Sequence, residues 1–191
     1  LPHLILETAN FHEGDITQIK KTIADFSLLK YPDKGIKFHA FKPENVVMPD
    51  YSSYPVVKNF FVKEEDWAGL IVMAKEKGLE VWLDLFCVYG VEILEKNLDK
   101  IKGIKLQPSI LDNLEITGAL EKLELKEKEL IINIAGLEIS EIEDYLTRYR
   151  GYHFKKIILQ MGYQNHPTRI EDSSFKKIEI LKAAFPGMEL G

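Results

Sequence analysis

The sequence lacks the features that mark several large classes of protein. Its single cysteine, Cys87, excludes an internal disulfide or a thiolate metal cluster, and we expect it to be a small buried hydrophobe. No apolar run approaches the ~20 residues of a membrane helix, and no signal peptide is visible. The net charge of -5 argues against electrostatic binding to nucleic acid or anionic lipid. We therefore expect a soluble, cytoplasmic protein whose partners are small molecules.

What the sequence does contain is a regular alternation of short apolar runs with longer amphipathic stretches. The apolar runs cover residues 4–9, 35–41, 79–86, 103–107, 129–135 and 155–161. This alternation is typical of βαβ units and a parallel sheet. We expect one α/β domain over residues 1–191, a (β/α)8 TIM-barrel type with about six βα units present. A seventh strand would begin near Met188, and the barrel is partial because a complete one needs ~250 residues.

Local signals predict where several helices begin and end. Asp15 is a candidate N-cap for a helix over 16–29, and Lys77-Gly78 is a typical end for a helix over 64–77. Ser140 with Glu143 resembles a capping box at the start of a helix over 140–150. The long segment 42–63 is predicted as a loop, and its part 46–61 is expected to lie over the barrel mouth as a lid.

Polar residues interrupt the predicted strands, mostly toward their C-terminal ends. Since side chains alternate between the faces of a strand, Lys37 and His39 share one face, opposite Ile36 and Phe38. The other strands follow the same pattern, and their polar residues are Glu7, Asp84, Lys105, Gln107, Asn133 and Gln160. In a barrel this face is the interior, and the C-terminal ends form the mouth where catalytic residues cluster.

Two lysines in one barrel mouth need anionic partners, because an unpaired buried charge is strongly disfavoured. Glu7 and Asp84 are the candidates within the chain, and pairing with them would make the cluster purely structural. The alternative is a bound phosphate or carboxylate, for which lysine is a suitable partner. The sequence leaves both interpretations open.

Four stretches resemble the sialic acid synthase family. Residues 7–15 (ETANFHEGD) are similar to its A-E-I-G-x-N-H-x-G-D segment, and residues 35–44 (GIKFHAFKPE) to its A-V-K-F-Q-T-F-K-P-E segment. Residues 104–114 resemble its K-I-x-S-x-E…N-x-x-L strand, and residues 158–167 its L-[HQ]-C-T-S-x-Y-P motif. These matches follow one another in order over essentially the whole chain.

The resemblance implies a reaction and a set of site residues. Members of this family condense phosphoenolpyruvate with N-acetylmannosamine or a related amino sugar, giving a nine-carbon acid and phosphate. By resemblance, Lys37 and Lys105 hold phosphoenolpyruvate, Glu7 lies at the reaction centre, and Asn113 lines the pocket. A divalent metal, Mn²⁺ or Mg²⁺, activates the sugar aldehyde, and Gln160 takes the place of one of its ligands. The resemblance also implies a homodimer.

The sequence departs from the family at several of these positions. Asp84 stands where the family has a phosphate-binding threonine, while Pro108 and Ile110 replace a serine and a sugar-contacting glutamate. Asn133 lies in a fifth-strand motif that has changed. We keep Asp84 and Asn133 as candidate substrate-binding residues. An acidic group at a phosphate position is unfavourable unless a lysine or a metal offsets its charge.

Three histidines lie near the predicted mouth. His39 and His166 replace a glutamine and a tyrosine of the family, and with Glu7 they are our candidate catalytic residues. His12 is a candidate substrate-binding residue in the loop after the first strand. Histidine in such a place serves as an acid, a base or a metal ligand, or it is a hydrogen-bonded structural residue.

Two other functions fit the same residues. One is a barrel aldolase or isomerase that acts on a sugar or keto acid through Asp84 and His39. The other is a non-catalytic, ligand-binding relative. Asp84 is also a candidate cation ligand with Glu7, His39 and Gln160, because such oxygen and nitrogen donors suit Mn²⁺ or Mg²⁺.

Overall fold

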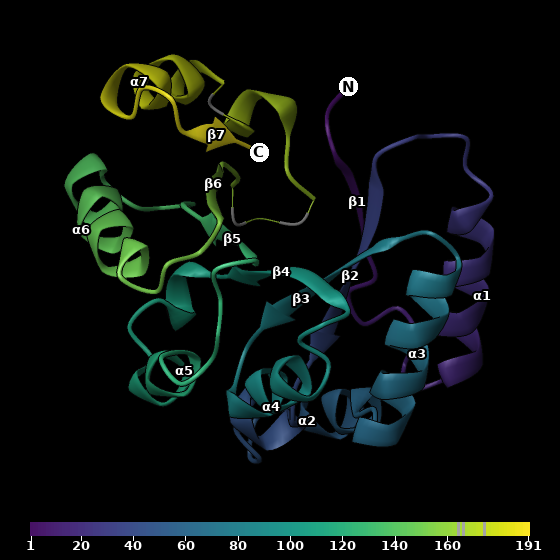
Figure 1. The fold of residues 1–191 in the computed structure, drawn as a ribbon. Coiled ribbons are helices and arrows are strands. Elements are labelled where there is room, and N and C mark those ends of the chain that lie inside the picture. Colours follow the sequence, from purple (N-terminus) through teal and green to yellow (C-terminus); the bar gives the residue numbers. More distant parts are fainter. Residues whose placement is uncertain (164, 166, 174) are drawn as a thin grey trace.

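The computed structural model describes residues 1–163, 165, 167–173 and 175–191. Within them, parallel strands form one seven-stranded sheet in which each strand pairs with the next along the chain. The strands are β1 Leu4–Glu7, β2 Lys34–Ala40, β3 Glu80–Leu85, β4 Ile101–Leu106, β5 Glu129–Asn133, β6 Lys156–Gln160 and β7 Glu189–Leu190. The sheet curls into a half-barrel with the helices around its outer side (Figure 1). The predicted parallel α/β class is confirmed, and the short β7 is the seventh strand expected near Met188.

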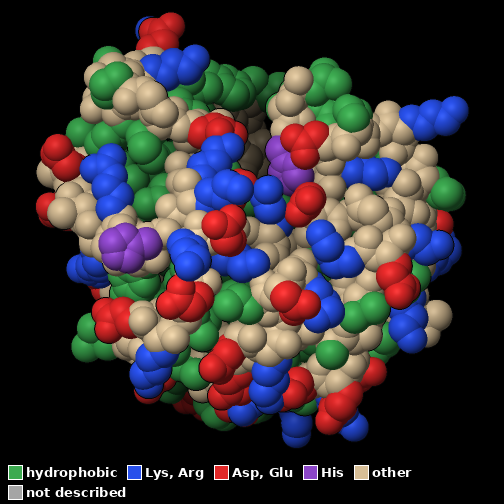
Figure 2. Space-filling model, viewed as in Figure 1, with side chains coloured by type: hydrophobic (Ala, Val, Ile, Leu, Met, Phe, Trp, Pro, Cys, Tyr) green, Lys and Arg blue, Asp and Glu red, His purple; other side chains and the backbone are tan. Residues whose placement is uncertain are grey.

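Helices connect the strands in the predicted positions. They are α1 Ile16–Ser27, α3 Glu64–Glu76, α4 Val88–Lys96, α5 Leu114–Leu120, α6 Ile139–Arg150 and α7 Lys176–Ala184. No helix in the described ranges is both long enough and apolar enough to span a bilayer. Basic and acidic side chains are interspersed over the face seen in Figure 2, in keeping with the small net charge.

The ends of the helices follow the local sequence signals with one exception. The Asp15 carboxylate accepts a hydrogen bond from the Thr17 N–H and so caps α1, while Gly78 ends α3 with a φ of +75°. The predicted capping box at Ser140 and Glu143 is wrong. Helix α6 begins two residues earlier than the Ser140 cap implies, and the Glu138 N–H donates to the Glu141 carboxylate at 2.7 Å.

The segment 42–63, predicted as a loop, contains three short helical turns at Pro43–Asn45, Tyr54–Val57 (α2) and Lys58–Phe60. The Tyr89 hydroxyl attaches it to α4 by donating to the Val62 carbonyl at 2.9 Å. The Lys42 ammonium lies over the same ring, 5.5 Å from its centroid. That this segment covers the barrel mouth stays a prediction.

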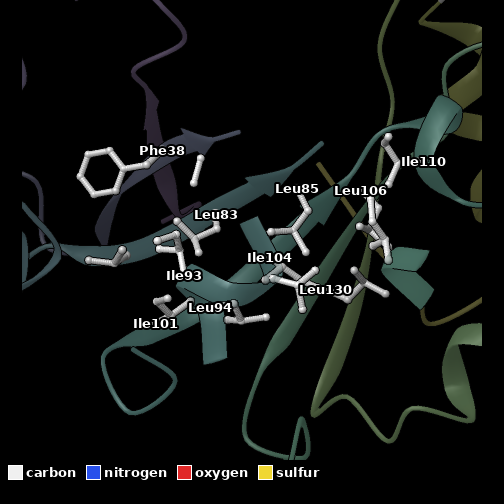
Figure 3. Close-up of a cluster of buried hydrophobic side chains, with 14 of the residues drawn as sticks. Phe38, Leu83, Leu85, Ile93, Leu94, Ile101, Ile104, Leu106, Ile110 and Leu130 are labelled. Carbon is white, nitrogen blue, oxygen red and sulfur yellow. The ribbon is translucent and has the colours of Figure 1, made fainter. Parts of the chain in front are cut away.

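The helix-facing side of the sheet forms the main hydrophobic core. Leu83, Ile104 and Leu130, on three successive strands, pack beside Ile93 and Leu94 of α4 (Figure 3). All five side chains are fully buried. These residues have the opposite parity to the polar strand residues, so the apolar face of each strand is turned toward the helices.

A single indole occupies the inner face near the strand starts. Trp82 is 1% exposed and donates from its ring nitrogen to His3 at 3.3 Å. Glycines face it on both neighbouring strands, Gly35 on β2 and Gly103 on β4, and a Cβ at either position would press against the indole. Trp82 is therefore a packing residue, and its layer lies between the strand starts and the polar residues at the strand ends.

Candidate active site

The polar strand residues gather at the carboxyl ends of their strands. Each is the last or the last but one residue of its strand: Glu7, His39, Asp84, Lys105, Asn133 and Gln160. The register sets Glu7 beside Lys37, and His39, Asp84 and Lys105 side by side on β2, β3 and β4. The parity predicted from the sequence thus places these groups on the inner face at one end of the half-barrel.

Asp84 is the centre of this cluster. Its carboxylate is fully buried, and its Oδ2 atom lies 3.2 Å from Lys37 Nζ and 3.1 Å from Lys105 Nζ. Lys37 also forms an ion pair with Glu7 and is itself only 4% exposed. The lysines are therefore neutralised by carboxylates of the chain itself, as one of the two interpretations of the sequence required.

Amides extend the cluster across the sheet to β5. Gln107 donates to Asp84 Oδ2 at 3.1 Å and accepts from Asn133 at 2.8 Å. Asn133 in turn accepts from the Ala135 N–H, which fixes its orientation. Gln107 is not among the predicted site residues. The available signal was its position two residues after Lys105, which places both side chains on the same side of an extended chain.

The charges of the cluster shift the pKa values of its members. Burial opposes ionisation of Glu7, but the hydrogen-bond and charge interactions of His39 and Lys37 outweigh it and lower the pKa of Glu7 to about 2. Burial likewise disfavours the charged form of Lys37, yet Asp84 and Glu7 raise its pKa. Burial lowers the pKa of Lys105. The attraction of Asp84 opposes this shift, but repulsion by the Lys37 ammonium adds to it. Lys37 is thus firmly cationic, while Lys105 is the more easily deprotonated lysine.

Three of these residues have the geometry of a metal site. Glu7, His39 and Asp84 each offer a ligand atom, and the three atoms lie within 4.8 Å of one another. His39 Nε2 is 2.7 Å from Glu7 Oε1, and the buried Asp84 Oδ1 has no hydrogen-bond partner among the described residues. Carboxylate oxygens and an imidazole nitrogen are ligands that Mn²⁺ or Mg²⁺ accepts. The residues present therefore fit a divalent ion.

A cavity of about 280 Å³ opens beside the cluster. Its lining is Ile5, Glu7, Lys37, Lys105, Ile131 and Gln160. The Gln160 Oε1 atom is buried, and no residue that the structure describes forms a hydrogen bond with it. Two ammonium groups, a carboxylate and a free amide oxygen in one small cavity form a surface suited to a small polar ligand.

His12 lies in a strained loop after β1. Ala9 and Glu13, on either side of it, have positive φ angles of 40° and 47°. The ring is 2% exposed, and its Nδ1 accepts the Gly14 N–H at 2.9 Å. Burial, and secondly the charge of His39, lower the pKa of His12. His12 is therefore held as a neutral, hydrogen-bonded ring.

A substitution at His12 should change the pH dependence of stability. Because the unfolded chain binds a proton at His12 near pH 6.5 and the folded chain resists it, stability is lost as pH falls below about 6.5. We expect His12→Asn, which keeps an acceptor for the Gly14 N–H, to reduce this loss between pH 7 and pH 5. Urea unfolding at several pH values measures it, with the exposed His153→Asn as control. Equal pH profiles for wild type and His12→Asn would contradict the assignment.

The structure gives Asn113, a predicted substrate-binding residue, a role at a helix terminus. Asn113 is the N-cap of α5, where its Oδ1 atom accepts from the N–H groups of Glu115 and Ile116. His166 lies outside the described residues, so its catalytic role stays a prediction. Pro108 and Ile110, which replace two polar family positions, form a short 3-10 turn directly after β4.

Fold and cluster together define a barrel-type α/β domain with a charged site at the carboxyl ends of its strands. A family model matches residues 33–191, and the chain belongs to the NeuB family. No curated protein sequence matches the chain significantly. The resemblance to the sialic acid synthase family is thereby confirmed over most of the chain.

Solved structures share this fold at low sequence identity. N-acetylneuraminic acid synthetase from Leptospira borgpetersenii, in complex with citrate, has a TM-score of 0.84 at 19% identity, covering 98% of this chain and 63% of that one. A candidate spore coat polysaccharide biosynthesis protein E from Chromobacterium violaceum has a TM-score of 0.86 at 16% identity, covering 100% and 58%. Spore coat polysaccharide biosynthesis protein spsE from Bacillus subtilis has a TM-score of 0.78 at 20% identity, covering 99% and 51%. The chain thus spans between half and two thirds of these structures.

Proposed function

We propose that this protein carries out a sialic acid synthase-like condensation of phosphoenolpyruvate with N-acetylmannosamine or a related amino sugar. One water molecule is consumed, and the products are a nine-carbon acid and inorganic phosphate. The observation that carries the proposal is the meeting of Lys37 and Lys105, the two lysines implied by the family resemblance, in one cavity at the mouth of a NeuB-family barrel. A structural neighbour that holds citrate, a small polyanion, supports an anionic ligand for this fold.

The residues divide the chemistry between them. Lys37 and Lys105 bind the phosphate and carboxylate of phosphoenolpyruvate as point charges. Glu7 is ionised and lines the cavity. Its carboxylate orients the sugar and takes part in proton transfer at the reacting carbonyl. Glu7, His39 and Asp84, with Gln160 nearby, would hold the divalent ion, which supplies Lewis-acid activation of the aldehyde when bound. His166 and the homodimer stay predictions of the family resemblance.

A second candidate function follows from Asp84. Its buried carboxylate already pairs with both lysines at the place where the family binds phosphate. An aldolase or isomerase that binds a sugar or keto acid without phosphate needs no displacement of these pairs. A cavity that prefers such a keto acid, in the presence of a divalent cation, to phosphoenolpyruvate would favour this candidate.

Calorimetric titration of phosphoenolpyruvate into the intact protein in the presence of Mn²⁺ tests the leading proposal. We expect saturable binding that Lys105→Met weakens ~10- to 100-fold, about 1.4 to 2.7 kcal/mol, because one of two anion-binding charges is lost. The matched control is Lys126→Met, whose side chain is 71% exposed. No binding at millimolar ligand, or equal weakening by both variants, would exclude the synthase function.

A further inference from the structure

We propose that Lys37 and a divalent cation compete for the carboxylates of Glu7 and Asp84, so that binding of the cation releases Lys37 and Lys105 for an anionic ligand. The inference rests on the proposed function in one respect, the assignment of the two lysines to an anion. It adds an order of binding that the family resemblance does not supply, because it depends on Asp84, where this chain departs from the family.

The first observation is the position of the Lys37 ammonium. It forms ion pairs with Glu7 and with Asp84, the latter at 3.2 Å. These are two of the three residues whose ligand atoms lie within 4.8 Å of one another. The ammonium therefore lies among the atoms that a divalent ion would use. A divalent cation held by the same carboxylate oxygens would leave no place for the ammonium there.

A second, independent observation is that donor atoms at this point are incompletely used. Asp84 is fully buried, and its Oδ1 atom has no hydrogen-bond partner among the described residues. The buried His39 Nε2 atom lies between the two carboxylates, 2.7 Å from Glu7 Oε1 and 3.5 Å from Asp84 Oδ2, and is a third possible ligand atom at the same point. A buried acceptor without a partner is costly, and a metal ion satisfies it.

The charge balance connects this site to the anion. Without a ligand, two carboxylates face two ammonium groups, so the charges of these four side chains cancel. A divalent cation takes over both carboxylates and adds two positive charges. Lys37 and Lys105 then line the 280 Å³ cavity without carboxylate partners, which is unfavourable until an anion pairs with them.

Binding of the cation and binding of the anion are therefore positively coupled. By thermodynamic linkage, the factor by which the cation tightens anion binding equals the factor by which the anion tightens cation binding. The lysines couple the two binding events. Once either ligand is bound, the other no longer has to separate Lys37 from Glu7 and Asp84.

Titration of Mn²⁺ into the intact protein, followed by calorimetry and by the water-proton relaxation of bound Mn²⁺, tests this inference. We expect Glu7→Gln and Asp84→Asn each to weaken Mn²⁺ binding at least tenfold, with the exposed Asp112→Asn as control. Lys37→Met should tighten Mn²⁺ binding severalfold, because no ammonium has to leave. Circular dichroism establishes that each variant is folded, and Lys105→Met, which removes an ammonium that pairs with Asp84 only, should tighten Mn²⁺ binding less than Lys37→Met does.

The coupling is measured with phosphoenolpyruvate, after correction for its association with Mn²⁺ in buffer. We expect saturating Mn²⁺ to tighten phosphoenolpyruvate binding at least tenfold, and phosphoenolpyruvate to tighten Mn²⁺ binding by the same factor. Equal phosphoenolpyruvate affinity with and without Mn²⁺, or unchanged Mn²⁺ affinity in both Asp84→Asn and Lys37→Met, would overturn the inference. Product formation separates it from the proposed function: coupling without phosphate release from any amino sugar rejects the synthase alone, and phosphate release without coupling rejects the inference alone.

Discussion

Replacing Asp84 with alanine is expected to lower the free energy of unfolding by about 3–5 kcal/mol, the usual loss when one partner of a buried ion pair is removed. Asp84 is fully buried and accepts Lys37, Lys105 and Gln107 on one oxygen atom. Without it, Lys105 loses its carboxylate and Lys37 keeps only Glu7. Two ammonium groups then lie in the half-barrel with a single counter-charge, which is why the effect should be large.

Urea unfolding measures this loss, with Asp112→Ala as the matched control. Asp112 pairs with Arg148 at 2.7 Å, but its side chain is 66% exposed, so its removal should cost only about 0–1 kcal/mol. A loss below 1 kcal/mol for Asp84→Ala would mean that water or deprotonation relieves the lysines, and that the cluster is less enclosed than the structure indicates.

Replacing Gly103 with alanine should destabilise the protein by about 3 kcal/mol, at the upper end of the range for overpacked cores. A Cβ at Gly103 would lie well inside 3.0 Å of both the Trp82 ring and the Glu129 carbonyl oxygen. The indole is fully enclosed, and the carbonyl belongs to the neighbouring strand β5. Neither can move away without separating β4 from β5 or displacing the layer that closes the half-barrel.

The control for Gly103→Ala is Gly69→Ala in α3. A Cβ there meets no atom within 4 Å, and alanine in a helix interior is favoured over glycine by about 0.5–1 kcal/mol. We therefore expect the two variants to change thermal stability in opposite directions. If Gly103→Ala unfolds at the wild-type temperature, the Trp82 layer is loosely packed.

Most of the fold could be predicted because a parallel half-barrel requires a simple pattern of apolar and polar residues in the sequence. Each strand buries one apolar face against helices, as Leu83, Ile104 and Leu130 do, so strands appear as short apolar runs between amphipathic stretches. The start of α6 could not be fixed in the same way. Glu138 and Ser140 both offer caps, and which one is used depends on the path of the preceding turn rather than on either residue alone.

The site was predictable in its membership but less so in its contacts. Alternation placed Lys37, His39, Asp84 and Lys105 on one face, and the register of the sheet then brings them together. Whether the lysines meet carboxylates or a ligand depends on side-chain distances of a few ångströms across strands, which no sequence pattern encodes. Asn113 shows the same limit, because a residue before a helix fits both a pocket and an N-cap, and here its oxygen caps α5.

The strand order also bears on how the chain folds. Because every strand pairs with the one before it, the sheet can be extended one βα unit at a time, without pairing strands that are distant along the chain. All the charged members of the cluster, from Glu7 to Lys105, belong to β1–β4. Pairing of β1 to β4 is therefore enough to bring the opposite charges together. The lysines of this site need never be buried alone, because their counter-charges reach the sheet in the same folding steps.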